Sequence, residues 1–77
     1  MTLGDLPPGA GGMIRLVGGK GALRRRLLEM GLTPGTTVYI EKLAPMGDPM
    51  EIRLRGYHLT LRKEDARNIE IGESGKE

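Results

Sequence analysis

Apolar and polar side chains alternate along several short segments of this chain, and each segment is bounded by glycine or proline. Alternation with a period of two is typical of strands that bury one face. In the first such segment, Ile14 and Leu16 share the apolar face and Arg15 lies on the other. The pattern predicts five strands, at Gly11–Val17, Thr36–Leu43, Met50–Arg55, Tyr57–Leu61 and Asn68–Ile71.

One segment has a helical pattern instead. Residues Ala22–Met30 are rich in strong helix formers, and Gly31 is well suited to end a helix. At about 100° per residue, Leu23, Leu27 and Met30 form one apolar stripe. Two minor segments complete the reading, an N-terminal leader at Thr2–Leu6 and a helical turn at Arg62–Arg67.

These elements predict a mainly β fold. Five short strands in a chain of 77 residues suggest one small closed or partly open β-barrel, with a short helical insertion after the first strand. A four-stranded sheet that carries one helix is the structural alternative. We expect a single domain over residues 1–71, and a flexible C-terminal tail over the polar, glycine-containing residues 72–77.

Few side chains are available for catalysis or metal binding. The chain has no cysteine, and its single histidine, His58, lies between Tyr57 and Leu59 in a predicted strand and faces away from them. A ferrous site needs several converging histidines or carboxylates. Residues 18–21 (GGKG) precede the helix but lack the Gly-Lys-Ser/Thr ending of a phosphate loop. We therefore expect no enzyme activity and no catalytic, cofactor-binding or metal-binding residues.

Composition and charge narrow the class of partner. The formal net charge of +2 is too small to indicate nucleic-acid binding by itself. Tyr39 and Tyr57 are the only aromatic residues, so stacking platforms for single-stranded nucleic acid are scarce. No secretory signal is visible, and no apolar run approaches the length of a membrane span. We expect a cytoplasmic domain without membrane insertion and without a nucleic-acid partner.

Four residues are candidates for binding a protein partner. Arg24 and Arg25 belong to a run of three arginines that forms either a solvated helix face or a contact for an acidic partner. Leu28 lies about 140° around the helix from Leu23, so it either packs beneath the leader or is an exposed apolar contact. Met46, at the tip of a loop rich in proline and glycine, suits an adaptable interface or caps one end of the barrel.

Several short motifs follow one another in a recognisable order. They are residues 26–32 (RLLEMGL), 34–36 (PGT) and 44–49 (APMGDP), continued by Ile52, Gly56-Tyr57, Leu59, Leu61-Arg62, Ala66, Ile69 and Ile71. Each motif alone is a weak signal, but the ordered set covers nearly the whole chain, from Leu3 to Ile71. In this set the chain resembles the FeoA family, ferrous-iron transport protein A.

The resemblance implies an SH3-like β-barrel with a helix inserted after the first strand. It also implies a cytosolic, non-enzymatic accessory or regulatory protein of bacterial ferrous-iron uptake, which contacts the cytosolic part of a FeoB-like membrane GTPase. The alternative is an SH3-like domain associated with nucleic acid or with an iron-dependent repressor. The direction of regulation and the formation of a homo-oligomer stay open at this point.

Overall fold

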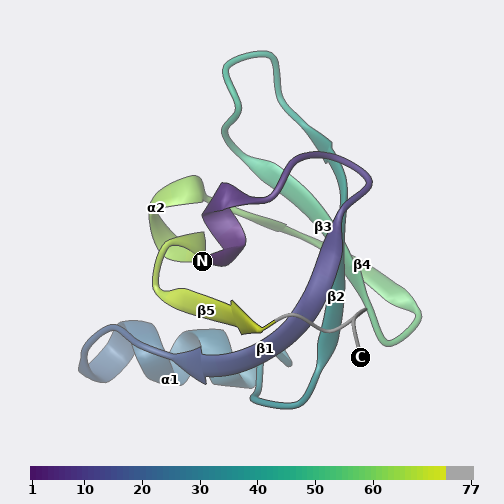
Figure 1. The fold of residues 1–77 in the computed structure, drawn as a ribbon. Coiled ribbons are helices and arrows are strands. Elements are labelled where there is room, and N and C mark those ends of the chain that lie inside the picture. The colour runs from purple at the N-terminus through teal and green to yellow at the C-terminus, as the bar shows by residue number, and fades with distance from the viewer. Residues whose placement is uncertain (73–77) are drawn as a thin grey trace.

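The computed structural model describes residues 1–72 (Figure 1). Along this part of the chain the elements are η1 (Leu3–Asp5), β1 (Gly11–Val17), α1 (Gly21–Glu29), β2 (Thr37–Leu43), β3 (Met50–Leu54), β4 (Tyr57–Leu61), α2 (Lys63–Ala66) and β5 (Ile69–Gly72). The strands form one antiparallel sheet in the order β4-β3-β2-β1-β5. The prediction of five strands with a helix after the first is confirmed, and the four-stranded alternative is wrong.

The ends of the strands agree with the prediction to within one residue. Arg55, expected at the end of the third strand, instead adopts a φ of 50° and forms a two-residue turn with Gly56, whose φ is 81°. Asparagine, glycine and aspartate usually occupy this left-handed conformation, so the presence of an arginine gave no reason to place a turn at residue 55. Gly72, which we expected in the tail, belongs to β5. The rest of the expected tail, residues 73–77, lies outside the described residues.

Strand β1 departs from simple alternation. Its register with β5 shifts between Ile14 and Leu16, so that Arg15 is an extra residue in the pairing. Because of this bulge, Val17 is buried and the side chain of Leu16 is 56% exposed. The expectation that Leu16 shares the buried face with Ile14 is therefore wrong.

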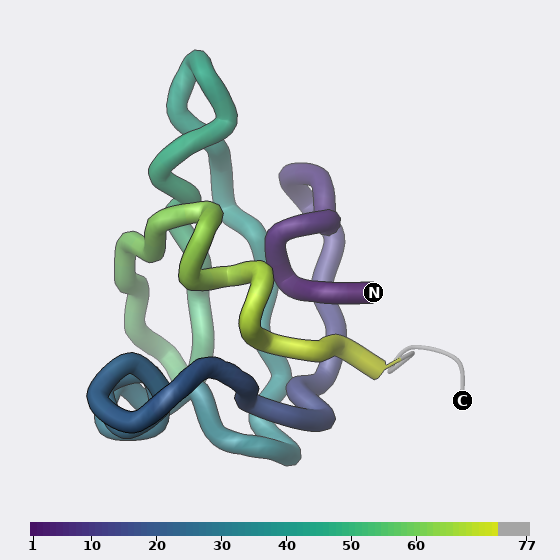
Figure 2. The backbone as a smooth tube through the Cα atoms, turned by 90° about the vertical axis from the view of Figure 1, so that its left-hand side faces the viewer, coloured from purple at the N-terminus to yellow at the C-terminus, as the bar shows by residue number. Residues whose placement is uncertain are grey.

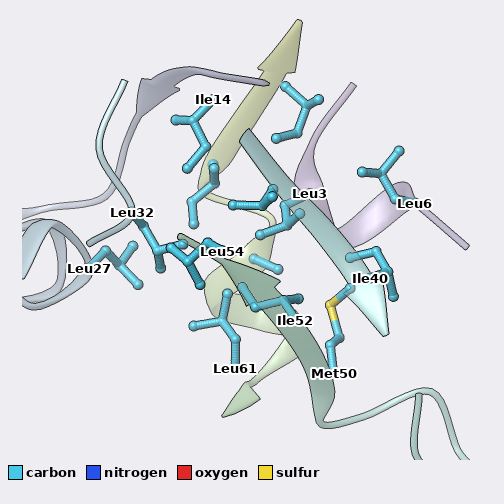
Figure 3. Close-up of a cluster of buried hydrophobic side chains, with 14 of the residues drawn as sticks. Leu3, Leu6, Ile14, Leu27, Leu32, Ile40, Met50, Ile52, Leu54 and Leu61 are labelled. Carbon is cyan, nitrogen blue, oxygen red and sulfur yellow. The ribbon is translucent and has the colours of Figure 1, made fainter. Parts of the chain in front are cut away.

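The core receives side chains from the sheet and from the segments that flank it (Figure 3). Leu3 in η1, Leu27 in α1 and Leu32 after α1 are all fully buried.

Hydrogen bonds from the backbone N–H and the hydroxyl of Thr2 hold the pKa of the Asp5 carboxyl below its ordinary value. The leader is thus an ordered part of the barrel, with Leu3 as its anchor.

The end of α1 is fixed by a contact with β4. The Tyr57 hydroxyl donates a hydrogen bond of 2.7 Å to the carbonyl oxygen of Met30. Gly31, at a φ of 97°, follows directly, and a Cβ atom at this position would collide with the same hydroxyl. Glycine is therefore required at residue 31 both by its backbone conformation and by the space that Tyr57 occupies.

This contact makes the effect of Gly31→Ala depend on Tyr57. In the wild-type background, the substitution should lower the free energy of unfolding by about 2–3 kcal/mol, because backbone strain adds to the loss of the tyrosine hydrogen bond. In a Tyr57→Phe background the hydroxyl is absent, so only the backbone cost of about 1–2 kcal/mol should remain. Urea unfolding of the four proteins measures both penalties, and equal penalties in the two backgrounds would contradict this account.

Candidate functional site

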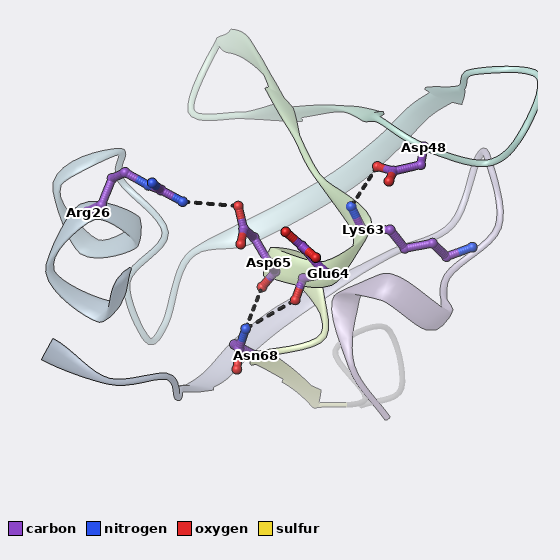
Figure 4. Close-up of polar contacts among 6 residues, drawn as sticks. All are labelled: Arg26, Asp48, Lys63, Glu64, Asp65 and Asn68. Carbon is purple, nitrogen blue, oxygen red and sulfur yellow. Dashed lines mark hydrogen bonds and ion pairs between the residues drawn. The ribbon is translucent and has the colours of Figure 1, made fainter. Parts of the chain in front are cut away.

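The three arginines of α1 have different environments. The Nε atom of Arg24 donates a hydrogen bond of 3.1 Å to the carbonyl oxygen of Val17, which ties the helix to the end of β1. The Nη2 atom of Arg26 lies 3.1 Å from the Asp65 carboxylate in α2 (Figure 4). Arg25 is exposed and makes no hydrogen bond or ion pair through its side chain within residues 1–72. Of the two arginines that we selected, Arg25 is therefore available to a partner, whereas Arg24 has a structural contact.

The structure places Leu28 between the two alternatives that the sequence left open, a side chain packed beneath the leader and an exposed apolar contact. Its side chain is half-buried and packs against the core cluster. The leader packs mainly against α2 and β5, so the leader is not the principal cover of Leu28. An acidic substitution at this position would place a charge against the core.

Met46 is 90% exposed at the tip of the loop between β2 and β3. The loop is braced at its base, where the N–H of Ala44 bonds to the carbonyl oxygen of Pro49 at 3.1 Å. The Asp48 carboxylate also accepts a hydrogen bond of 2.8 Å from the N–H of Lys63 at the start of α2 (Figure 4). Met46 is therefore presented to solvent by a loop that is closed at its base and attached to α2 through Asp48.

The candidate residues do not form one continuous surface. Figures 1 and 2 show the loop of Met46 and helix α1 at opposite ends of the barrel. Arg24, Arg25 and Leu28 share α1, whereas Met46 stands alone at the far end. The four candidate residues therefore lie in two separate regions, one on α1 and one on the loop of Met46, and they do not form a single patch.

A row of polar side chains on the outer face of the sheet was not singled out by the sequence. Tyr39, Arg53 and His58 lie directly opposite one another on β2, β3 and β4. The Arg53 guanidinium carbon is 5.0 Å from the centroid of the Tyr39 ring, and its Nε atom is 2.6 Å from the Glu41 carboxylate. The alternation of polar residues in each strand was visible, but the register that aligns three strands was not. His58 lies on this outer face, as the alternation predicted.

The described residues offer little for metal chemistry. Within residues 1–72, no group of three or more histidine, cysteine, aspartate or glutamate side chains is arranged to hold a metal ion. His58 approaches only Glu41, at 4.0 Å, and Glu41 is already paired with Arg53. In the same range, no helix combines the length and the apolar character needed to cross a membrane.

Comparison with known proteins identifies the family of this chain. The family model "FeoA domain" matches residues 1–72. A fusion protein of Porphyromonas gingivalis, described as Fe(2+) transport protein A/Fe(2+) transporter FeoB, is 41% identical over 71 residues, which are 92% of this chain and 8% of that protein. The chain thus spans a small fraction of the length of this curated relative.

Solved structures of related proteins have the same fold as this chain. A FeoA-like protein from Clostridium acetobutylicum superposes with a TM-score of 0.84 at 38% identity, covering 92% of this chain and 85% of that one. FeoA of Stenotrophomonas maltophilia, described as a procaryotic SH3 domain protein in complex with zinc, has a TM-score of 0.82 at 26% identity, covering 94% and 89%. The chain therefore belongs to the FeoA domain family, and it shares its fold with solved FeoA structures, one of which is described as an SH3 domain protein.

The distinction between the arginines predicts different effects on stability. Arg24→Ala should lower the free energy of unfolding by about 1 kcal/mol, because the hydrogen bond to Val17 is lost. Arg25→Ala should change it by less than about 0.5 kcal/mol, as is usual for an exposed residue without such contacts. Urea unfolding of both variants provides the test, and equal effects would mean that the Val17 contact contributes nothing.

Proposed function

We propose that this domain acts in the cytoplasm as a regulator of ferrous-iron uptake and works by direct contact with a membrane-bound GTPase transporter of the FeoB type. The observation that carries the proposal is the Porphyromonas fusion protein, in which a domain 41% identical to this chain is joined to a FeoB transporter. A covalent link keeps two domains at a high effective concentration. Such a link favours domains that work in contact, and the same contact would form between separate chains.

The surface supports a protein partner better than a nucleic acid. Within residues 1–72, two arginines are paired with carboxylates, Arg53 with Glu41 and Arg26 with Asp65. Lys42 also lies 3.9 Å from Glu51. A phosphate backbone is usually bound by a continuous stripe of unpaired lysines and arginines, and here three basic side chains are paired with carboxylates instead.

Arg25 and Met46 are the residues best placed to contact the transporter. Both are exposed and lack structural partners in the described part of the chain. Arg25 suits an acidic group of the transporter, and the flexible Met46 side chain suits a shallow apolar site. Because the two residues lie at opposite ends of the barrel, we treat them as independent contacts. Arg24 and Leu28 contribute to the α1 contact indirectly, by holding the helix against β1 and the core.

Charge reversal should separate contact residues from core residues. Arg25→Glu and Met46→Asp should each weaken binding to the purified transporter by about tenfold while the thermal midpoint stays nearly unchanged, because neither side chain is buried. Leu28→Asp should instead lower the midpoint strongly, since it places an unpaired charge against the core. Surface-immobilised transporter in detergent provides the binding measurement.

The exposed Leu16 supplies a matched control. Leu16→Asp replaces another exposed apolar side chain, which belongs neither to α1 nor to the loop of Met46, so it should leave binding unchanged. If wild-type protein does not bind the transporter, the proposed function is wrong. If folded Arg25→Glu and Met46→Asp variants bind as well as the wild type does, only the choice of contact residues is wrong.

A further inference from the structure

The two edge strands of the sheet differ in whether another segment covers them. At the β5 edge, the N–H of Ile71 bonds to the carbonyl oxygen of Met1 at 2.9 Å, and Thr2 forms a bridge with Glu70. The N-terminal leader therefore covers this edge. Strand β4 is the other edge, and within residues 1–72 no strand pairs with its outer side.

The pairing of β4 with β3 determines which backbone groups face outward. Leu54 and Tyr57 close the two-residue turn at Arg55–Gly56, so they form a hydrogen-bonded pair. Bonded and non-bonded pairs alternate along an antiparallel ladder. The pairs that include His58 and Thr60 are therefore non-bonded, and the N–H and C=O groups of these two residues point away from β3.

These four backbone groups are unpaired in the described part of the chain. No backbone or side-chain hydrogen bond outside the ladders involves the N–H or C=O of His58 or Thr60. The ladder runs through five consecutive pairs without a bulge, and β4 contains no proline or lysine. Proteins commonly use those features to block an edge strand, so this edge is open to an additional strand.

A groove lies beside the open edge. It has a volume of about 330 Å³ and is lined by Arg26, Met30, Thr60, Leu61, Arg62 and Asp65. Strand β4 and the start of α2 provide one side of the groove and helix α1 the other; Figure 4 shows Arg26 and Asp65 reaching toward each other from the two helices. A strand edge next to a helix is the arrangement by which several peptide-binding domains hold an extended segment.

Charge identifies the kind of segment that fits. The groove contains Arg26 and Arg62 against one carboxylate, Asp65, and Arg62 makes no ion pair within residues 1–72. Arg55 lies beyond the other end of β4. Antiparallel pairing of β4 with a second copy would bring Arg55 of one chain close to Arg62 of the other, and like charges oppose this. An acidic segment of a different protein is therefore favoured over a second copy.

We propose that the β4 edge binds an extended, acidic segment of the transporter as an added strand, through the backbone groups of His58 and Thr60. The segment forms up to four backbone hydrogen bonds, places a carboxylate near Arg62 and directs one apolar side chain toward Met30. The identity of the partner rests on the proposed function, whereas the mode of binding rests on the open edge and its groove.

A proline substitution tests the edge without removing the inner ladder. His58→Pro deletes one outward N–H and places a ring on the edge, and proline is tolerated where the missing N–H faces solvent. The affinity for purified transporter should fall by at least about tenfold. His58→Ala retains the N–H and should lose much less affinity. Equal affinities of a folded His58→Pro variant and the wild type would overturn the proposal.

Amide hydrogen exchange of the wild-type domain decides the question even if the proline variant does not fold. On addition of the transporter, the amides of His58 and Thr60 should become protected, while those of Leu59 and Leu61 are already protected in the free domain. Binding that leaves His58 and Thr60 exchanging rapidly would overturn this inference and leave the proposed function intact. Absence of wild-type binding would overturn both.

Two further results bear on the identity of the segment. Arg62→Glu should weaken transporter binding by about tenfold, and undiminished binding would show that the segment is not acidic. Concentration-dependent protection of His58 and Thr60 in the domain alone would show that a second copy occupies the edge, which contradicts the proposal.

Discussion

The structure depends on filling the core of a small curved sheet with side chains from outside the sheet. A chain of this size buries a limited share of its surface, and the strands alone do not enclose their apolar faces. Leu3 from η1, Leu27 from α1 and Leu32 after α1 are fully buried for this reason. Because Leu27 must reach the core, α1 is held close to the barrel, and its polar face is directed outward.

The position of α1 in turn sets the local polar contacts. Arg24 bonds to the end of β1, Arg26 pairs with α2, and the carbonyl of Met30 accepts a bond from Tyr57 in β4. Each contact is modest, since exposed ion pairs and single hydrogen bonds contribute about 1 kcal/mol or less. Together they attach the helix to three different elements. Arg25 is the arginine of the run that takes part in none of these contacts.

Much of this fold could be predicted from the sequence, because alternation and turn residues are local signals. The bulge at Arg15 could not be predicted, since it depends on pairing with β5 and leaves no glycine as a marker. The Arg24–Val17 bond and the half-buried state of Leu28 depend on how the helix docks, which periodicity does not specify. The open edge of β4 was also hidden, because strand order is a tertiary property.

The two ends of the barrel that carry Arg25 and Met46 are connected by strand β4. It begins at Tyr57, which bonds to the end of α1, and ends at Leu61, which pairs with Met50 next to the loop of Met46. The groove beside α1 shares Thr60 and Arg62 with a second hollow that reaches Asp48 and Pro49 in that loop. A segment bound along β4 would therefore run from the helix toward the loop. One extended partner bound in this way would contact both ends of the barrel, and recognition would then depend on the strand between them.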